Sequence, residues 1–142
     1  MRTKSSNLIL VAGVIMAIAL ACNFSATTAN ISGLKLGKDE RVSQETNSFE
    51  PDDSIYAVAV ISNAPGKLKV RGRLLVESVT GQEAGPIPGL EDTVDLEGSG
   101  TATFTFSPPA KGWPKGSYKI EVIMMDESGQ QKDQEATSFT VS

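Results

Sequence analysis

The chain has 142 residues, of which 39% are hydrophobic and 21% are charged, and its net charge is −4 at pH 7. An acidic balance of this kind disfavours nucleic acid and anionic lipid head groups as the main partner. The sequence contains no histidine, which excludes Ser-His-Asp and Cys-His mechanisms and removes the commonest ligand of catalytic zinc.

The first residues have the pattern of an export signal. Arg2 and Lys4 precede an apolar run over residues 8–21. As a helix this run is about 21 Å long, which is short of the roughly 30 Å hydrocarbon core that a spanning helix must cross. We therefore predict a signal peptide at residues 1–21. Both of its charges are basic, so its removal makes the remaining chain more acidic.

The single cysteine, Cys22, directly follows Ala19-Leu20-Ala21. Small or aliphatic residues before a cysteine are typical of a lipoprotein signal, so we expect lipidation at Cys22 and a flexible tether over residues 22–30. This predicts a membrane-anchored protein of the cell envelope, at the outer membrane in a Gram-negative cell because Asn23 follows. The same residues also form an Ala-x-Ala site for ordinary cleavage before Cys22, which would give a soluble periplasmic or secreted accessory domain, such as an inhibitor or an adhesin-like subunit.

Beyond the tether, apolar residues alternate with polar ones at period 2, the pattern of half-buried strands. No further cysteine is present, so the domain holds no internal disulfide. Strand spacing of this kind predicts an all-β, seven-stranded antiparallel immunoglobulin-like sandwich over residues 31–142. The expected strands cover 31–36, 54–61, 67–77, 93–96, 101–106, 117–125 and a last segment that ends at 141.

The connections between these strands differ in length. Short ones are expected at 62–66, 97–100 and 126–129, and long ones at 37–50, 79–91 and 107–116. Because strand direction alternates, the long connections fall at one end of the sandwich, and the first strand begins at the other.

Apolar, proline-stiffened residues in the long connections suggest a contact surface for a protein or polysaccharide partner. We predict that Ile87, Leu90, Trp113 and Pro114 form it. The alternative is that these side chains close the bottom of the core, above all Trp113, since tryptophan is usually well buried.

Two segments carry a resemblance to known domains. Pro114-Lys115-Gly116-Ser117-Tyr118 resembles the tyrosine corner of immunoglobulin and fibronectin type III domains. Phe49-x-Pro51-x-Asp53-x-Ile55-Tyr56 with Gly112-Trp113-Pro114-x-Gly116-x-Tyr118 resembles small exported bacterial immunoglobulin-like domains of undefined role. The resemblance implies a sandwich and assigns no catalytic residue.

Other polar clusters have simpler explanations. The carboxylate pairs Asp52/Asp53, Glu91/Asp92 and Asp126/Glu127 lie near turns, without a cleft to bring two of them together as a glycosidase requires. The turn 126–129 lacks the acid spacing of a calcium loop.

A basic stripe, Lys67, Lys69, Arg71 and Arg73, could bind anions or a polysaccharide, or pair with Asp95 and Glu97 across the strands. Lys132, Asp133 and Glu135 discourage pairing at the last strand and favour a monomer. The sequence thus predicts a binding or structural module that is not an enzyme, with no cofactor and no metal site.

Overall fold

The computed structural model describes residues 28–142. The predicted signal peptide, Cys22 and most of the predicted tether lie outside the described residues. The described chain forms eight strands: β1 (Asn30–Gly37), β2 (Ser48–Phe49), β3 (Ile55–Ser62), β4 (Leu68–Val79), β5 (Gly85–Leu96), β6 (Gly100–Phe106), β7 (Gly116–Asp126) and β8 (Gln131–Val141). No helix long and apolar enough to cross a membrane occurs among residues 28–142.

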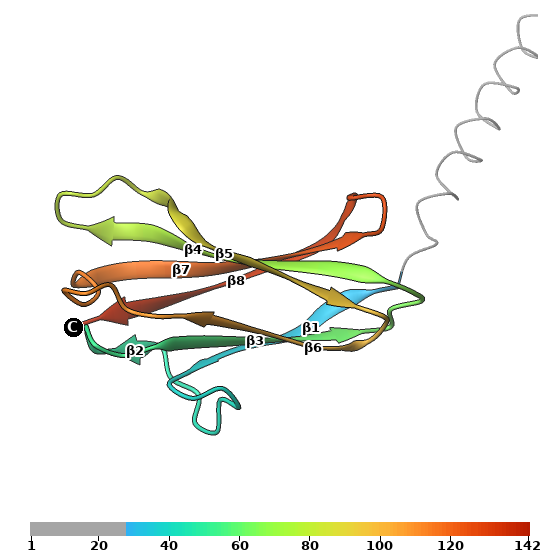
Figure 1. Ribbon diagram of the computed structural model, residues 1–142, viewed down its shortest axis with the longest axis horizontal. Helices are drawn as coiled ribbons and strands as arrows, with labels where there is room; N and C mark the ends of the chain where they lie inside the picture. The colour runs from blue at the N-terminus through green and yellow to red at the C-terminus, as the bar shows by residue number, and fades with distance from the viewer. Residues whose placement is uncertain (1–27) are drawn as a thin grey trace, which may run out of the picture.

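The strands form two sheets that lie one above the other (Figure 1). One sheet has three strands in the order β1-β3-β6, and the other has five in the order β2-β8-β7-β4-β5. Neighbouring strands are antiparallel except for β2, which runs parallel to β8 over two residues. This is the predicted immunoglobulin-like sandwich, with one short strand more than the sequence indicated.

The core lies between the inner faces of the two sheets, where apolar side chains alternate with outward ones. In β3 the buried residues are Ile55, Ala57, Ala59 and Ile61. In β7 the residues buried on the inner face are Tyr118, Ile120, Val122 and Met124, all at 1% exposure or less. The period-2 pattern therefore locates the core correctly.

A hydrogen bond also joins the two sheets at the start of β1. The backbone N–H of Ile31 donates to the carboxylate of Asp133 in β8 at 2.8 Å, next to an irregularity in the pairing of β1 with β3 between Ile31 and Gly33. Asp133, expected to discourage pairing along β8, thus satisfies a backbone donor of the neighbouring sheet.

The predicted long connection at 79–91 is wrong. β4 continues to Val79 and β5 begins at Gly85, so the two strands form an extended hairpin. Pro86 and Pro88 favoured a loop over residues 79–91, because proline cannot donate a hydrogen bond to a neighbouring strand. β5 is the edge strand of its sheet, where a missing donor is tolerated.

The two ends of the sandwich carry different connections. The connections over residues 38–54, 80–84 and 107–115 lie at the end that also carries the C-terminus, on the left in Figure 1. β1 begins at the opposite end, beside the turns that follow β3, β5 and β7. The described chain therefore starts at the end opposite the two longest connections, 38–54 and 107–115.

Candidate functional site

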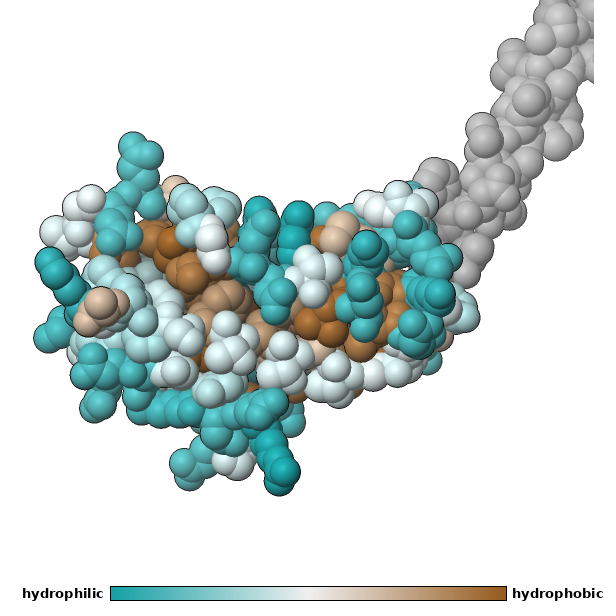
Figure 2. All heavy atoms as spheres, in the orientation of Figure 1, coloured by the Kyte–Doolittle hydropathy of each residue, from teal (hydrophilic) through white to brown (hydrophobic). Residues whose placement is uncertain are grey.

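An apolar pocket of about 340 Å³ lies between β5 and the connection from β6 to β7. It brings together all the residues that the sequence suggested as a contact surface. On the face seen in Figure 2, apolar side chains reach the surface beside β5, toward the end that carries the C-terminus. The lining consists of Gln82, Ile87, Pro88, Leu90, Ser107, Pro109, Trp113, Pro114 and Tyr118.

One wall comes from an irregularity in β5. Arg73 of β4 pairs with Glu91 and Leu75 pairs with Pro86, so residues 87–90 stand opposite Leu74 alone. Gly89 has a positive φ of 80°, a conformation that glycine adopts without strain. The extra residues form a bulge, and both Ile87 and Leu90 turn toward the core and are partly buried against it.

The opposite wall is the connection that carries Trp113, and it is tied to the segment before β3. The backbone N–H of Trp113 donates to the carbonyl of Pro51 at 2.8 Å. Its indole Nε1–H donates to the carbonyl of Asp53, also at 2.8 Å. With 4% exposure, Trp113 belongs to the core and contributes part of its surface to the pocket. The alternative that Trp113 closes the core is therefore confirmed, while its role as a partner contact stays a prediction.

Tyr118 forms the predicted tyrosine corner. Its hydroxyl donates to the carbonyl of Pro114 at 2.5 Å, and burial raises the pKa of this hydroxyl. The ring stacks on Phe139 with centroids 5.4 Å apart and meets Trp113 edge-on at 6.4 Å. Phe139 in turn contacts Phe49 at 5.3 Å. The floor of the pocket is thus part of a packed aromatic cluster.

The predicted carboxylate pairs lie at different places. Asp53 lies at the pocket end, where its carboxylate accepts the backbone N–H of Glu50 at 2.7 Å and pairs with Lys38 at 3.0 Å. The Glu50 hydrogen bond and then Lys38 hold the pKa of Asp53 below its usual value. Glu91 and Asp92 belong to β5. A general acid needs a raised pKa, so Asp53 is poorly suited to that role.

Asp126 lies at the other end and organises the turn between β7 and β8. It accepts hydrogen bonds from the Ser128 hydroxyl and backbone and from the backbone N–H of Gln130. These bonds, with the Ser128 hydroxyl first, lower the pKa of Asp126. Among residues 28–142, no group of three or more His, Cys, Asp and Glu side chains is arranged to hold a metal ion.

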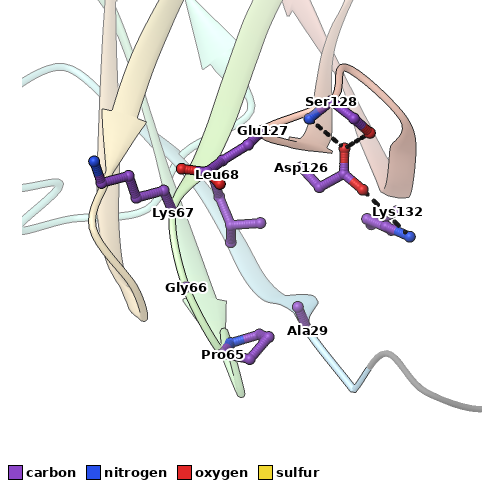
Figure 3. A pocket seen from close by; sticks show the side chains of 9 residues that line it. All are labelled: Ala29, Pro65, Gly66, Lys67, Leu68, Asp126, Glu127, Ser128 and Lys132. Carbon is purple, nitrogen blue, oxygen red and sulfur yellow. Dashed lines mark hydrogen bonds and ion pairs between the residues drawn. The ribbon is translucent and has the colours of Figure 1, made fainter.

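A larger hollow, about 460 Å³, adjoins this turn (Figure 3). Its charged side chains are Lys67, Asp126, Glu127 and Lys132. Asp126 pairs with Lys132 at 3.5 Å, and Figure 3 shows the same carboxylate held by Ser128. Since Asp126 and Lys132 form an ion pair with each other, their charges are not free for a ligand in this hollow. We therefore take the apolar pocket as the candidate site.

The basic stripe is only partly explained by pairing with β5. Lys67 lies 4.0 Å from Glu97, and Lys69 stands opposite Asp95. Arg73, however, pairs with Glu121 of β7 at 2.6 Å. Sequence reasoning missed Glu121, which is 9% exposed on the outer face of the five-stranded sheet. Its position opposite Arg73 depends on the strand order.

Arg71 differs from its neighbours in the stripe. It faces Thr93 on β5 and Ile123 on β7, and its buried Nε makes no hydrogen bond within the described residues. The outer face of this sheet is therefore not a continuous row of ion pairs.

The sequence matches no protein-family model and no curated protein. Among solved structures it resembles part of a β-glucosidase from Listeria innocua, with a TM-score of 0.51 and 15% identity over 78% of this chain and 16% of that chain. It also resembles part of β-glucuronidase 2 from Bacteroides uniformis, with a TM-score of 0.51 and 13% identity over 79% of this chain and 14% of that chain.

An immunoglobulin-like protein from Pseudomonas aeruginosa aligns over 82% of this chain and 98% of its own, with 14% identity and a TM-score of 0.47. The chain thus corresponds to a small part of each glycosidase, 16% and 14% of their lengths. At 15% and 13% identity, the likeness to these two glycosidases shows the fold alone.

Proposed function

We propose that this protein is a non-enzymatic binding module of the bacterial cell envelope, anchored by a lipid on Cys22, which presents its apolar pocket to a partner. One observation carries the proposal. Ile87 and Leu90 from β5 and Trp113 and Pro114 from a distant connection line a single pocket, at the end opposite the start of β1.

The position of the pocket fits an anchor that precedes β1. A lipid on Cys22 would be joined to β1 by fewer than ten residues, and an extended chain spans at most about 3.5 Å per residue. The end of the sandwich where β1 begins would then face the membrane. The pocket, one strand length away, would point outward and be open to a partner.

The absence of charge in the pocket argues for binding and against catalysis. None of its described lining residues is Asp, Glu, Lys or Arg. General acid–base or carboxylate chemistry needs such a group within reach of the substrate. The pocket can bury an apolar group, but its lining supplies no charged residue to move a proton.

Photo-crosslinking in living cells tests the binding role. A photoreactive amino acid at Ile87 should give adducts of discrete mass, whereas one at Thr105, exposed on β6, should not. Adding Leu90→Asp to the Ile87 probe should abolish the adducts without unfolding the domain. Equal adducts from both positions, or adducts that survive Leu90→Asp, would contradict a partner at this pocket.

Fractionation separates the anchored form from the soluble alternative. Cys22→Ser should move the protein from the membrane fraction to the soluble fraction if the cysteine carries the lipid. A wild-type protein that is already soluble would favour ordinary cleavage before Cys22 and a periplasmic or secreted binding module.

A further inference from the structure

We infer that the pocket binds the alkyl chain of a small amphiphile. The inference rests on the proposed binding function and narrows it, because the sequence left both a protein and a polysaccharide open as partners. Four properties of the described lining residues support it: their hydrogen-bonding state, their lack of charge, their stiffness and the size of the space that they line.

The aromatic residues of the lining have no hydrogen-bond donor to offer. The Trp113 indole N–H is used by the carbonyl of Asp53, and the Tyr118 hydroxyl by the carbonyl of Pro114. A sugar hydroxyl placed against them would lose its bonds to water and gain little in return. An alkyl chain has no such bonds to lose, so these aromatic surfaces favour hydrocarbon over polysaccharide.

The lining also favours a ligand with no charge inside the pocket. No charged side chain is among the described lining residues, so an ionised group would be desolvated there without a partner. The polar members, Gln82 and Ser107, are exposed. They can hydrogen-bond a polar head group that stays in contact with water, while the chain enters between Ile87, Leu90 and Trp113.

The pocket is stiff and of the right size. Pro88, Pro109 and Pro114 restrict the backbone of both walls, and the floor belongs to the packed aromatic cluster. A preformed apolar site loses little conformational freedom when it is filled. Its volume of about 340 Å³ lies at the small end of ligand pockets, which run from about 300 to 1,000 Å³. It therefore suits a chain of limited length.

The single tryptophan provides a direct measurement, because Trp113 lines the pocket. We would use the mature protein as its host cell processes it, kept in solution by an amphipathic polymer. The probes are fatty acids brominated at the chain end, since bromine quenches indole emission on contact. Unbrominated acids of equal length control for binding without quenching.

We expect saturable quenching of Trp113, with an affinity that rises about fourfold per methylene as the chain lengthens from about six carbons and levels off once the pocket is full. Leu90→Asp and, independently, Ile87→Asp should abolish it. Leu96→Asp is the matched control, since Leu96 is a partly buried leucine of the same strand outside the pocket. Near-ultraviolet circular dichroism identifies the variants that fold.

Two results would overturn the inference. One is the absence of quenching at every chain length in the folded wild type. The other is quenching that grows without levelling off and is equal in the folded Leu90→Asp and Leu96→Asp proteins, which would mark partition into the polymer. If either occurs while Leu90→Asp still abolishes the cellular adducts from Ile87, the alkyl ligand is wrong and the binding function stands.

Discussion

The ring of Phe104 occupies the space where Gly72 has no side chain. A Cβ at position 72 would lie 2.7 Å from Cγ of Phe104 and 2.8 Å from two further ring atoms. Gly72 lies in β4 and Phe104 in β6, on the inner faces of opposite sheets, and both are buried. The smallest residue of β4 thus lets an aromatic ring fill the centre of the sandwich.

Gly72→Ala should therefore destabilise the domain by about 1 to 3 kcal/mol, because overpacking forces the ring or the strand to move. Urea unfolding measures the change. Gly66→Ala is the matched control, since a Cβ there meets nothing within 4 Å. Similar unfolding midpoints for the two variants would show that the Phe104 ring leaves room for a side chain at position 72.

The tyrosine corner should contribute to stability through its hydroxyl. Tyr118→Phe removes the donor to the Pro114 carbonyl and should cost about 1 kcal/mol. Backbone amides of the connection over residues 107–115 should also exchange faster with solvent. Tyr56→Phe, at a half-buried tyrosine of β3, serves as the control. Unchanged stability and exchange in Tyr118→Phe would mean that packing alone holds this corner.

The ion pair Arg73–Glu121, on the outer face of the five-stranded sheet, should contribute more to the free energy of unfolding than the exposed pair Lys67–Glu97 at the end of that sheet. Arg73 and Glu121 side chains are 28% and 11% exposed, whereas those of Lys67 and Glu97 are 63% and 86% exposed. Glu121→Gln should cost about 1 to 2 kcal/mol, and Glu97→Gln less than about 0.5 kcal/mol.

The double variant Arg73→Leu/Glu121→Leu should recover part of the loss seen in Glu121→Leu, since no unpaired charge remains. Chemical denaturation of the wild type, Arg73→Leu, Glu121→Leu and the double variant measures this coupling. Strictly additive losses would show that the two side chains do not interact energetically.

Acid should weaken the domain partly through Asp53. Its pKa is lowered in the folded state from a usual value of 3.8, so its contribution is present above that value and is lost as the pH falls through the lowered pKa. Asp53→Asn should be less stable than the wild type at neutral pH and should lose less stability on acidification. Urea unfolding midpoints measured from neutral to acidic pH give the pH dependence of stability for the wild type and for Asp53→Asn. Asp52→Asn serves as the neighbouring control. Parallel curves of stability against pH for the wild type and Asp53→Asn would show that protonation of Asp53 does not contribute to the acid sensitivity.

The strands, the core and the tyrosine corner could be read from the sequence because each depends on local pattern. Period-2 alternation identifies the inward residues of β3 and β7, and the spacing of Tyr118 from Gly116 identifies the corner. The shape of β5 could not be read in this way. Its prolines break the local pattern, and only its position at a sheet edge makes them acceptable.

The candidate site was predictable as a set of residues but not as a pocket. Apolar side chains in proline-rich connections pointed to Ile87, Leu90, Trp113 and Pro114. Their meeting depends on the bulge at residues 87–90 and on the hydrogen bonds from Trp113 to Pro51 and Asp53, which are long-range contacts. The partnership of Arg73 with Glu121 escaped prediction for the same reason, because it follows from strand order.

The mass of the processed N-terminus tests the central claim of an anchored module most directly. Mass spectrometry of the protein purified from its cell membrane should find a chain that begins at Cys22 and carries the added mass of a diacylglyceryl group on that residue. A chain that begins with an unmodified Cys22, or one that retains residues 1–21, would contradict the lipid anchor.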